Sequence, residues 1–248
     1  AALAGDPVSA FGGILIANKE IDLSTANLIN SLFCEVVLAP SFNEEALELI
    51  VSAIEKSKLI PGKDIVICLD VAANELINKD GFYSIQSSNF TSVEDTVNYY
   101  KKLTINYPIK SIEDPFAEED WSAWKKITAE IGNKIQVVGD DLFVTNTKRL
   151  QRGINEKSAN SILVKPNQIG TLTETLEVIS MAKKSNFNTI ISHRSGDTED
   201  TFIADLAVAT ESSQIKTGSL ARSERVAKYN RLLRIEEELG NHAKMAKI

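Results

Sequence analysis

The chain has 248 residues and a formal net charge of −7, with 43% hydrophobic and 25% charged residues. This is the composition of an ordinary globular protein, and the negative charge argues against nucleic acid as a partner. No apolar run approaches the roughly 20 residues of a membrane span, and no signal peptide opens the chain. We therefore expect a cytoplasmic protein in which Cys34 and Cys68, both in apolar runs, are reduced core thiols.

The first 42 residues predict a short α/β segment. Apolar runs at 14–17 and 35–38 indicate strands, and a helix is predicted between them over 24–33. The glycine pair Gly12-Gly13 precedes a strand instead of opening a helix, so it is weak evidence for a phosphate loop. The pattern changes at Asn43, where two glutamates begin an amphipathic helix, and we place a domain boundary there.

From residue 43 onward, apolar runs repeatedly end at a charged or hydrogen-bonding residue. The residues that mark the six strand ends are Asp70, Glu113, Asp140, Lys165, His193 and Lys216. Most of the gaps between them are close to the roughly 30 residues of a βαβ step, with a helix predicted in each. This favours an α/β fold, a (β/α)8-type TIM barrel that is incomplete, with about six βα units. An open doubly wound sheet is the alternative.

Local signals indicate several connecting elements. Lys79-Asp80-Gly81 between apolar runs predicts a hairpin turn, and Ser92 is placed to cap a helix through Leu103. Trp121 and Trp124, three residues apart, are expected to pack one helix face. The last predicted helix runs from Ser223 to Leu239 and ends at Gly240, as a C-terminal cap should.

Carboxylates at three strand ends point to a metal site. Asp70, Glu113 and Asp140 offer the oxygen ligands that a hard divalent cation prefers, and Mg²⁺ is the natural candidate. Acids at strand ends also cap the helices that follow them. Because three consecutive strands carry one, we favour the metal site.

Cations at the later strand ends suit an anionic substrate. Lys165 ends an apolar strand, where a lysine is costly unless it meets anions and where its amine can serve as a base for proton abstraction. Arg194 and Ser195 offer a guanidinium fork and a hydroxyl for phosphate, and Lys216 adds a further cation. His193 either contacts the substrate or supports the residues that do. Together these groups suggest metal-assisted proton abstraction from a small phosphorylated acid.

Residues 43–248 resemble the carboxyl-terminal part of the enolase (phosphopyruvate hydratase) family. The motifs that carry the resemblance are Leu69-Asp70, Ser111-Ile112-Glu113-Asp114-Pro115, Gly139-Asp140-Asp141-Leu142-Phe143-Val144-Thr145-Asn146, Lys165-Pro166-Asn167-Gln168-Ile169-Gly170, Ser192-His193-Arg194-Ser195-Gly196, Gln214-Ile215-Lys216-Thr217-Gly218 and Arg234-Ile235-Glu236-Glu237-Glu238.

The resemblance implies a glycolytic lyase that converts 2-phosphoglycerate to phosphoenolpyruvate. A lysine base working with magnesium is established for this superfamily, so that chemistry comes from the resemblance. It implies Lys165 as the catalytic base, Arg194 and Ser195 on the phosphate, and Lys216 and His193 in the substrate site. It also implies Asp70, Glu113 and Asp140 as magnesium ligands, and a homodimer.

The amino-terminal 42 residues do not share this resemblance. They are similar to a fragment of the AICAR transformylase/IMP cyclohydrolase family, on residues 5–13 and 35–40, and the residues matching Gly12 and Glu35 lie at that family's nucleotide pocket. The Lys-His catalytic motif of that family has no counterpart here. The capping domain, acid glutamate and mobile serine loop of enolases also match nothing in residues 1–42.

We therefore expect little enolase activity from these 248 residues alone, and poor folding, because general acid help is typically worth 10² to 10⁴-fold and unpaired strands leave open edges. Since Ala1 is not an initiator methionine, we expect the chain to start inside a longer or processed protein. Two alternatives stay open. The chain is a non-catalytic metal-binding remnant, or it is a chimaera or an assembly artefact joined near residues 41–47.

Overall fold

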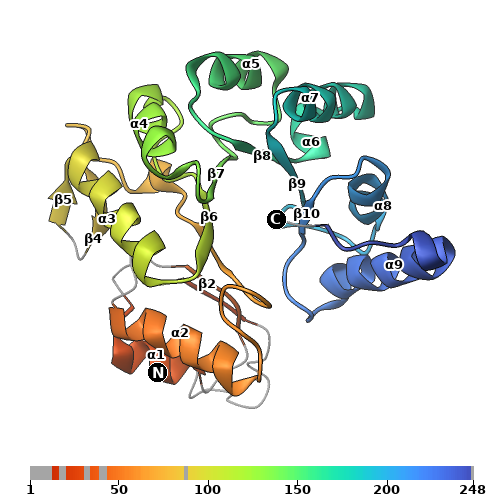
Figure 1. Ribbon diagram of the computed structural model, residues 1–248, viewed down its shortest axis with the longest axis horizontal. Helices are drawn as coiled ribbons and strands as arrows, with labels where there is room; N and C mark the ends of the chain where they lie inside the picture. Colours follow the sequence, from red (N-terminus) through yellow and green to blue (C-terminus); the bar gives the residue numbers. More distant parts are fainter. Residues whose placement is uncertain (1–12, 17–20, 31–33, 39–43, 87–88, 247–248) are drawn as a thin grey trace. The chain divides into compact units, whose positions relative to one another are not determined.

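The computed structural model describes residues 13–16, 21–30, 34–38, 44–86 and 89–246. Within these ranges helices and strands alternate along most of the chain (Figure 1). Their bounds are β1 Gly13–Ile16, α1 Leu23–Asn30, β2 Cys34–Leu38, α2 Glu44–Lys56, β3 Ile67–Asp70, η2 Ala73–Glu75, β4 Tyr83–Gln86, β5 Asn89–Thr91, α3 Val93–Asn106, β6 Ile109–Glu113, α4 Trp121–Ile131, β7 Gln136–Gly139, α5 Thr147–Glu156, β8 Ser161–Val164, α6 Pro166–Ile169, α7 Leu172–Lys184, β9 Asn188–Ser192, α8 Phe202–Ala209, β10 Gln214–Lys216, α9 Ser223–Leu239 and η3 Gly240–His242.

The chain divides into two compact units, Ala1–Ser111 and Ile112–Ile248, and strand β6 crosses the division. Hydrogen bonds join six strands in the order β10-β9-β8-β7-β6-β3. From β6 to β10, neighbours in the sheet are also neighbours along the chain. A doubly wound sheet would reverse its order at a switch point, so this sequence of strands is that of a (β/α)8 barrel. The predicted incomplete TIM barrel of six strands is confirmed.

In the first unit, β1 and β2 form a parallel pair, and β4 and β5 form an antiparallel pair. Helices α1 and α2 share a small apolar cluster that contains Ile21, Ala26 and Ala46. The expected turn at residues 79–81 is present, since the Gly81 N–H donates to the carbonyl of Asn78. Ser92 caps α3 as predicted, because its hydroxyl accepts from the Asp95 N–H at 3.2 Å.

The prediction that Cys68 lies in the core is wrong. The thiol is exposed and is not in a disulfide. The reason is the alternation of side chains along a strand. On β3 the side chain of Ile67 is buried, so the next residue points to the opposite face. Gly12 and the side chains of Cys34 and Glu35 lie outside the described part of the structure, so the sequence-based expectations for them stay predictions.

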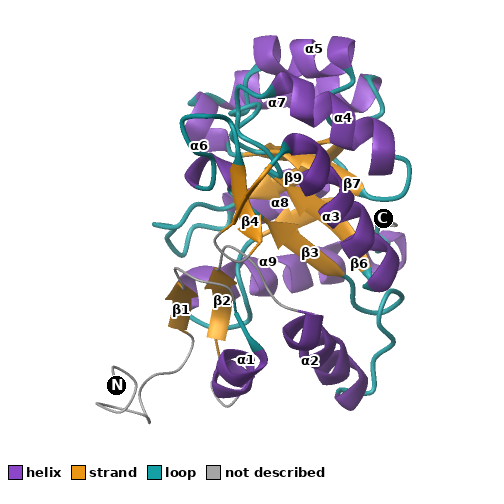
Figure 2. Cartoon of the chain, turned by 90° about the vertical axis from the view of Figure 1, so that its left-hand side faces the viewer, coloured by secondary structure: helices purple, strands orange, loops and turns teal. Residues whose placement is uncertain are grey.

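The second unit alternates strand and helix from the end of β6 to α9. The pairings β7–β8, β8–β9 and β9–β10 are all parallel. In Figures 1 and 2 the helices α4, α5, α7, α8 and α9 surround these strands on the outer side. Val138, Leu163 and Ile190, from three adjacent strands, form one buried cluster. Parallel strands covered in this way carry near-continuous apolar runs, which is why they could be found from the sequence.

The helices of the second unit follow their local signals. Trp121 and Trp124 are both buried on α4, as expected for a helix face turned to the core. The last helix spans Ser223–Leu239 and has Gly240 at its C-terminal cap, as predicted. None of the helices in the described part of the chain is long and apolar enough to cross a membrane.

Candidate active site

Five of the predicted site residues lie at the ends of adjacent strands of the second unit. Glu113 is the last residue of β6, Asp140 follows β7, and Lys165 follows β8. His193 follows β9, and Lys216 is the last residue of β10. In parallel strands these carboxyl ends meet at one edge of the sheet, which is where barrel proteins build their active sites.

Two lysine–carboxylate pairs form at this edge. Lys165 donates from Nζ to Oδ2 of Asp140 at 2.5 Å, and both side chains are mostly buried. Lys216 donates from Nζ to both carboxylate oxygens of Glu113, at 2.8 and 2.9 Å. The second pair joins residues that are 103 positions apart in the chain. Four residues that were predicted from their places at strand ends thus form two pairs in direct contact.

The remaining predicted ligand, Asp70, ends β3 in the first unit, where its side chain is exposed. Its place beside Glu113 and Asp140 stays a prediction.

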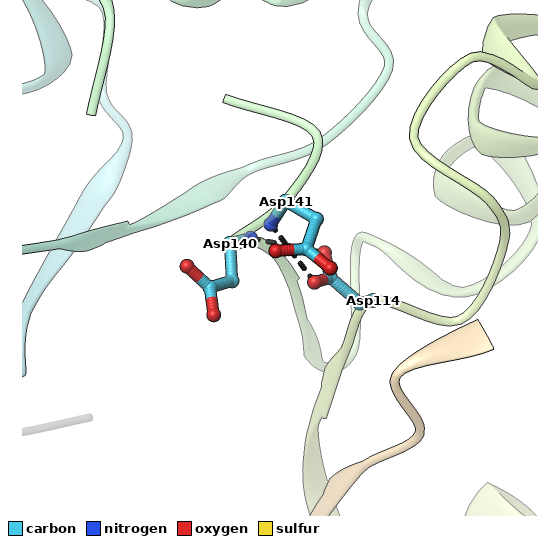
Figure 3. Close-up of side chains that lie close together, drawn as sticks. All are labelled: Asp114, Asp140 and Asp141. Carbon is cyan, nitrogen blue, oxygen red and sulfur yellow. Dashed lines mark hydrogen bonds between the residues drawn. The ribbon is translucent and has the colours of Figure 1, made fainter. Parts of the chain in front are cut away.

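Asp114, which the sequence analysis did not select, holds the backbone of the acid pair. Its Oδ1 accepts from the Asp140 N–H at 3.0 Å, and its Oδ2 accepts from the Asp141 N–H at 2.9 Å. Figure 3 shows both bonds, with the Asp140 carboxylate turned away from Asp114. The three acids offer oxygens within 4.8 Å of one another. Because both Asp114 oxygens accept backbone N–H groups, we assign it a structural part in this cluster.

The loop after β7, residues 139–146, is called the acidic loop. The ring of Phe143 is fully buried against two glycines, Gly139 and Gly153, and a Cβ on either would come within 2.5 Å of it. The hydroxyl of Thr145 accepts from the Lys165 N–H at 2.9 Å and lies 3.1 Å from Gln168 Oε1. These contacts connect the loop that carries Asp140 to the strand end that carries Lys165.

The loop after β9, residues 193–198, is called the basic loop. Arg194 and Ser195 are exposed there, with Arg194 Nη1 3.5 Å from Asn167 Oδ1. From α9, the buried side chain of Arg225 reaches the ring nitrogen Nδ1 of His193. The predicted phosphate-binding pair is therefore open to solvent on a loop that α9 supports from inside.

Burial dominates the electrostatics of the site. It raises the pKa of Asp140, while the hydrogen bond from Lys165 opposes the rise. Burial also raises the pKa of Asp114 well above its usual range, against the effect of the two backbone N–H groups. For His193, burial and then the charge of Arg225 lower the pKa to about 4, so its imidazole is neutral at pH 7.

The acids at this edge fit a divalent cation. Asp140 is 9% exposed, and its Oδ1 is a buried acceptor without a hydrogen-bond partner among the described residues. Glu113 is also buried, and its carboxylate is paired with Lys216. A buried carboxylate oxygen that lacks a donor is suited to coordinate a hard cation such as Mg²⁺.

Fold and site together place the chain among TIM-barrel proteins whose strand ends carry paired acids and lysines. More particularly, the chain belongs to the enolase family, since the family described as "Enolase, C-terminal TIM barrel domain" matches residues 31–248. It is 64% identical over 237 residues to the Enolase of Pelagibacter ubique (strain HTCC1062).

That alignment covers 95% of this chain and 56% of the relative, so the chain spans about half the length of the curated protein it matches. The family match begins at residue 31, on the amino-terminal side of the boundary predicted at residue 43. The division into segments 1–42 and 43–248 stays a prediction.

Proposed function

We propose that this chain forms the barrel part of an enolase-type lyase that dehydrates 2-phosphoglycerate to phosphoenolpyruvate. The observation that carries the proposal is the pair of contacts Lys165–Asp140 and Lys216–Glu113 at one edge of a barrel sheet. A base, further cations and buried carboxylates are there within reach of one small anionic substrate. Membership of the enolase family supports this assignment.

In the proposed reaction Lys165, as the neutral amine, accepts the proton from C2 of the substrate. The electron pair left by the C2–H bond forms the new double bond as the C3 hydroxyl departs. The exposed Arg194 and Ser195 bind the phosphate, for which a guanidinium fork is well shaped. Lys216 balances negative charge near the substrate carboxylate, and His193 lines the same site.

Magnesium is the proposed cofactor, with Asp70, Glu113 and Asp140 as its ligands. When bound, it supplies positive charge that offsets the negative charge of the substrate. The support from this chain is the buried Asp140 Oδ1 and the buried Glu113 carboxylate, both of the oxygen type that magnesium prefers.

Departure of the hydroxide needs a proton donor, and none of the proposed site residues has that role. We therefore propose that the chain by itself forms phosphoenolpyruvate slowly. Proton abstraction by Lys165 does not require that donor, so exchange at C2 is the more direct test of the site.

The test follows deuterium exchange at C2 of 2-phosphoglycerate in D₂O with magnesium, by proton NMR. We expect exchange with the wild-type chain, and a loss of 10² to 10⁴-fold for Lys165→Met, the usual range for a catalytic base. Lys148→Met, which removes an exposed amine on α5, is the matched control and should exchange at the wild-type rate. Magnesium binding in a calorimeter without any exchange would instead favour the non-catalytic metal-binding protein.

We also propose that the enzyme works in glycolysis in the cytoplasm and forms a homodimer. Membership of the enolase family is the support for these three points. Sedimentation of the purified chain tests the dimer.

A further inference from the structure

Arg225 is a buried cation that reaches beneath the basic loop. It lies in the first turn of α9 and is 3% exposed. Its Nη1 contacts His193 Nδ1 and donates to the carbonyl of Arg194 at 3.2 Å, while Nη2 donates to the carbonyl of Ser195 at 3.2 Å. Within the described residues, its Nε has no partner. One guanidinium therefore holds three consecutive residues of the proposed substrate site through their acceptors.

The contact with His193 determines where the imidazole proton lies. A guanidinium only donates, and it stays protonated in proteins. The ring nitrogen that it faces must then be an acceptor, so Nδ1 carries no proton. In a neutral imidazole the proton is consequently on Nε2, which leaves that nitrogen as the donor of the ring.

The surroundings of Arg225 restrict it to this position. A Cβ on Gly218 would lie 2.8 Å from Arg225 Cδ and 3.1 Å from Cγ, so the backbone after β10 packs directly on the arginine stem. Asp197, in the basic loop, approaches Arg225 Nη1 at 3.9 Å and the buried Lys228 at 3.2 Å. The side chain thus connects the loop that follows His193 to the loop that follows Lys216.

We propose that Arg225 is a positioning residue, which keeps His193 as the neutral tautomer with its proton on Nε2 and orients the backbone of residues 193–195. Only the catalytic consequence, a fixed donor and a fixed phosphate loop, rests on the proposed lyase function. The arrangement of hydrogen bonds does not depend on it. A lysine cannot replace this group, because a single ammonium does not span the three acceptors in one plane.

The low pKa of His193, about 4, agrees with this arrangement. After burial, the largest effect on it is the charge of Arg225, and the charges of Lys216 and Lys228 act in the same direction. Asp197 acts in the opposite direction. Loss of the Arg225 charge should therefore move the pKa of His193 upward.

The experiment is nitrogen-15 NMR of the histidine rings in the 248-residue chain, without substrate or metal. The chain has two histidines, His193 and His242, so a His242→Gln variant assigns both sets of signals. For the wild type at neutral pH we expect His193 to show Nδ1 as a pure acceptor and Nε2 as protonated. A proton on Nδ1, or a mixture of tautomers, would overturn the proposal.

Arg225→Met removes the donor and keeps an apolar stem of similar length. We expect a mixture of tautomers and a His193 midpoint well above about 4, moving toward the ordinary 6.5. Unchanged ring signals and an unchanged midpoint would contradict the proposal. Arg225→Lys, which keeps a positive charge and should fold if the methionine variant does not, is expected to keep a low midpoint but lose the pure-acceptor signal.

Arg231→Gln is the matched control on the same helix. It removes an arginine whose fork binds Asp205, with contacts of 2.6 to 3.0 Å, outside the basic loop. Its His193 signals should equal those of the wild type. The measurement needs neither substrate nor turnover. The role of Arg225 can therefore be tested even if the chain shows no deuterium exchange at C2 of 2-phosphoglycerate.

Discussion

The acidic loop after β7 and the basic loop after β9 perform related tasks by different means. Most side chains of the acidic loop are buried or half-buried, whereas most of the basic loop is exposed. In each, however, the supporting side chain is of the same charge type as one proposed functional residue of its loop. Asp114 is a carboxylate beneath carboxylates, and Arg225 is a cation beneath the loop of Arg194.

Backbone polarity explains how like charges can support one another. Asp114 accepts from backbone N–H groups, while Arg225 donates to backbone carbonyls, so neither bonds the functional side chain that shares its charge. The backbone can supply donors to an acid and acceptors to a base at almost any position. A site can therefore be held in place without neutralising the charges it needs.

The difference in burial between the two loops agrees with the different roles proposed for them. The acidic loop is packed around Phe143 and joined to Lys165 through Thr145, which suits a preformed metal and base site. The acidic loop also contains two consecutive residues with positive φ, Val144 at 44° and Thr145 at 52°. Such backbone is costly for a β-branched residue and persists only where the surroundings fix it. Arg194 and Ser195 in the basic loop are exposed, as the proposed phosphate binding requires.

Asp114→Ala provides the largest expected change of stability in this comparison. It leaves the N–H groups of Asp140 and Asp141 without their acceptor, at a cost of about 1–3 kcal/mol for each one that stays buried. Urea unfolding of the wild type and the variant measures the loss. Glu177→Gln, at an exposed position on α7, is the control and should be near neutral. Equal midpoints for Asp114→Ala and this control would show that Asp114 does not hold the loop.

Two glycine variants compare the packing of the loops directly. In Gly153→Ala the new methyl would lie 2.4 Å from the ring of Phe143, and overpacking of this kind typically costs about 1–3 kcal/mol. In Gly196→Ala, within the basic loop, a Cβ meets nothing within 4 Å. The second change should be neutral or should stabilise the fold by up to about 1 kcal/mol, because alanine lowers the conformational entropy of the unfolded chain. Similar thermal midpoints for the two variants would contradict the assigned difference in packing.

The strand-end residues could be predicted because each one ends or directly follows an apolar run of the sequence. The same holds for Ser92 and Gly240, whose capping signals are local. The supporting residues could not be found in this way. Asp114 meets residues 26 and 27 positions away, and Arg225 meets a histidine 32 positions away, so both contacts depend on how the elements pack.

One signal for Asp114 was nevertheless present. It lies next to Glu113 at a strand end, where a carboxylate can accept backbone N–H groups. The predicted burial of Cys68 was wrong for a different reason. An apolar run does not show which of its residues face the core, because side chains alternate between the two faces of a strand. Arg225 has no such signal, because a charged residue early in a helix is normally assigned to the exposed face.

The last prediction concerns the stability of the folded chain against acid. The folded-state pKa of His193, about 4, lies below the ordinary value of 6.5. Between these two values the unfolded chain binds a proton at this residue and the folded chain does not, so stability contributed by His193 falls as the pH drops from about 6.5 to about 4. Above pH 6.5 that contribution is complete.

His193→Gln should remove this component, so its free energy of unfolding should decline less than that of the wild type over this pH range. At each pH, the free energy of unfolding of the variant is subtracted from that of the wild type. The difference removes the contribution of the carboxylates, which titrate in the same pH range. In Arg225→Met the folded-state pKa moves toward 6.5, so the same component should shrink while the histidine stays in place. A wild-type slope that survives in both variants would place the proton uptake elsewhere, and the contact between His193 and Arg225 would then not contribute to the stability against acid.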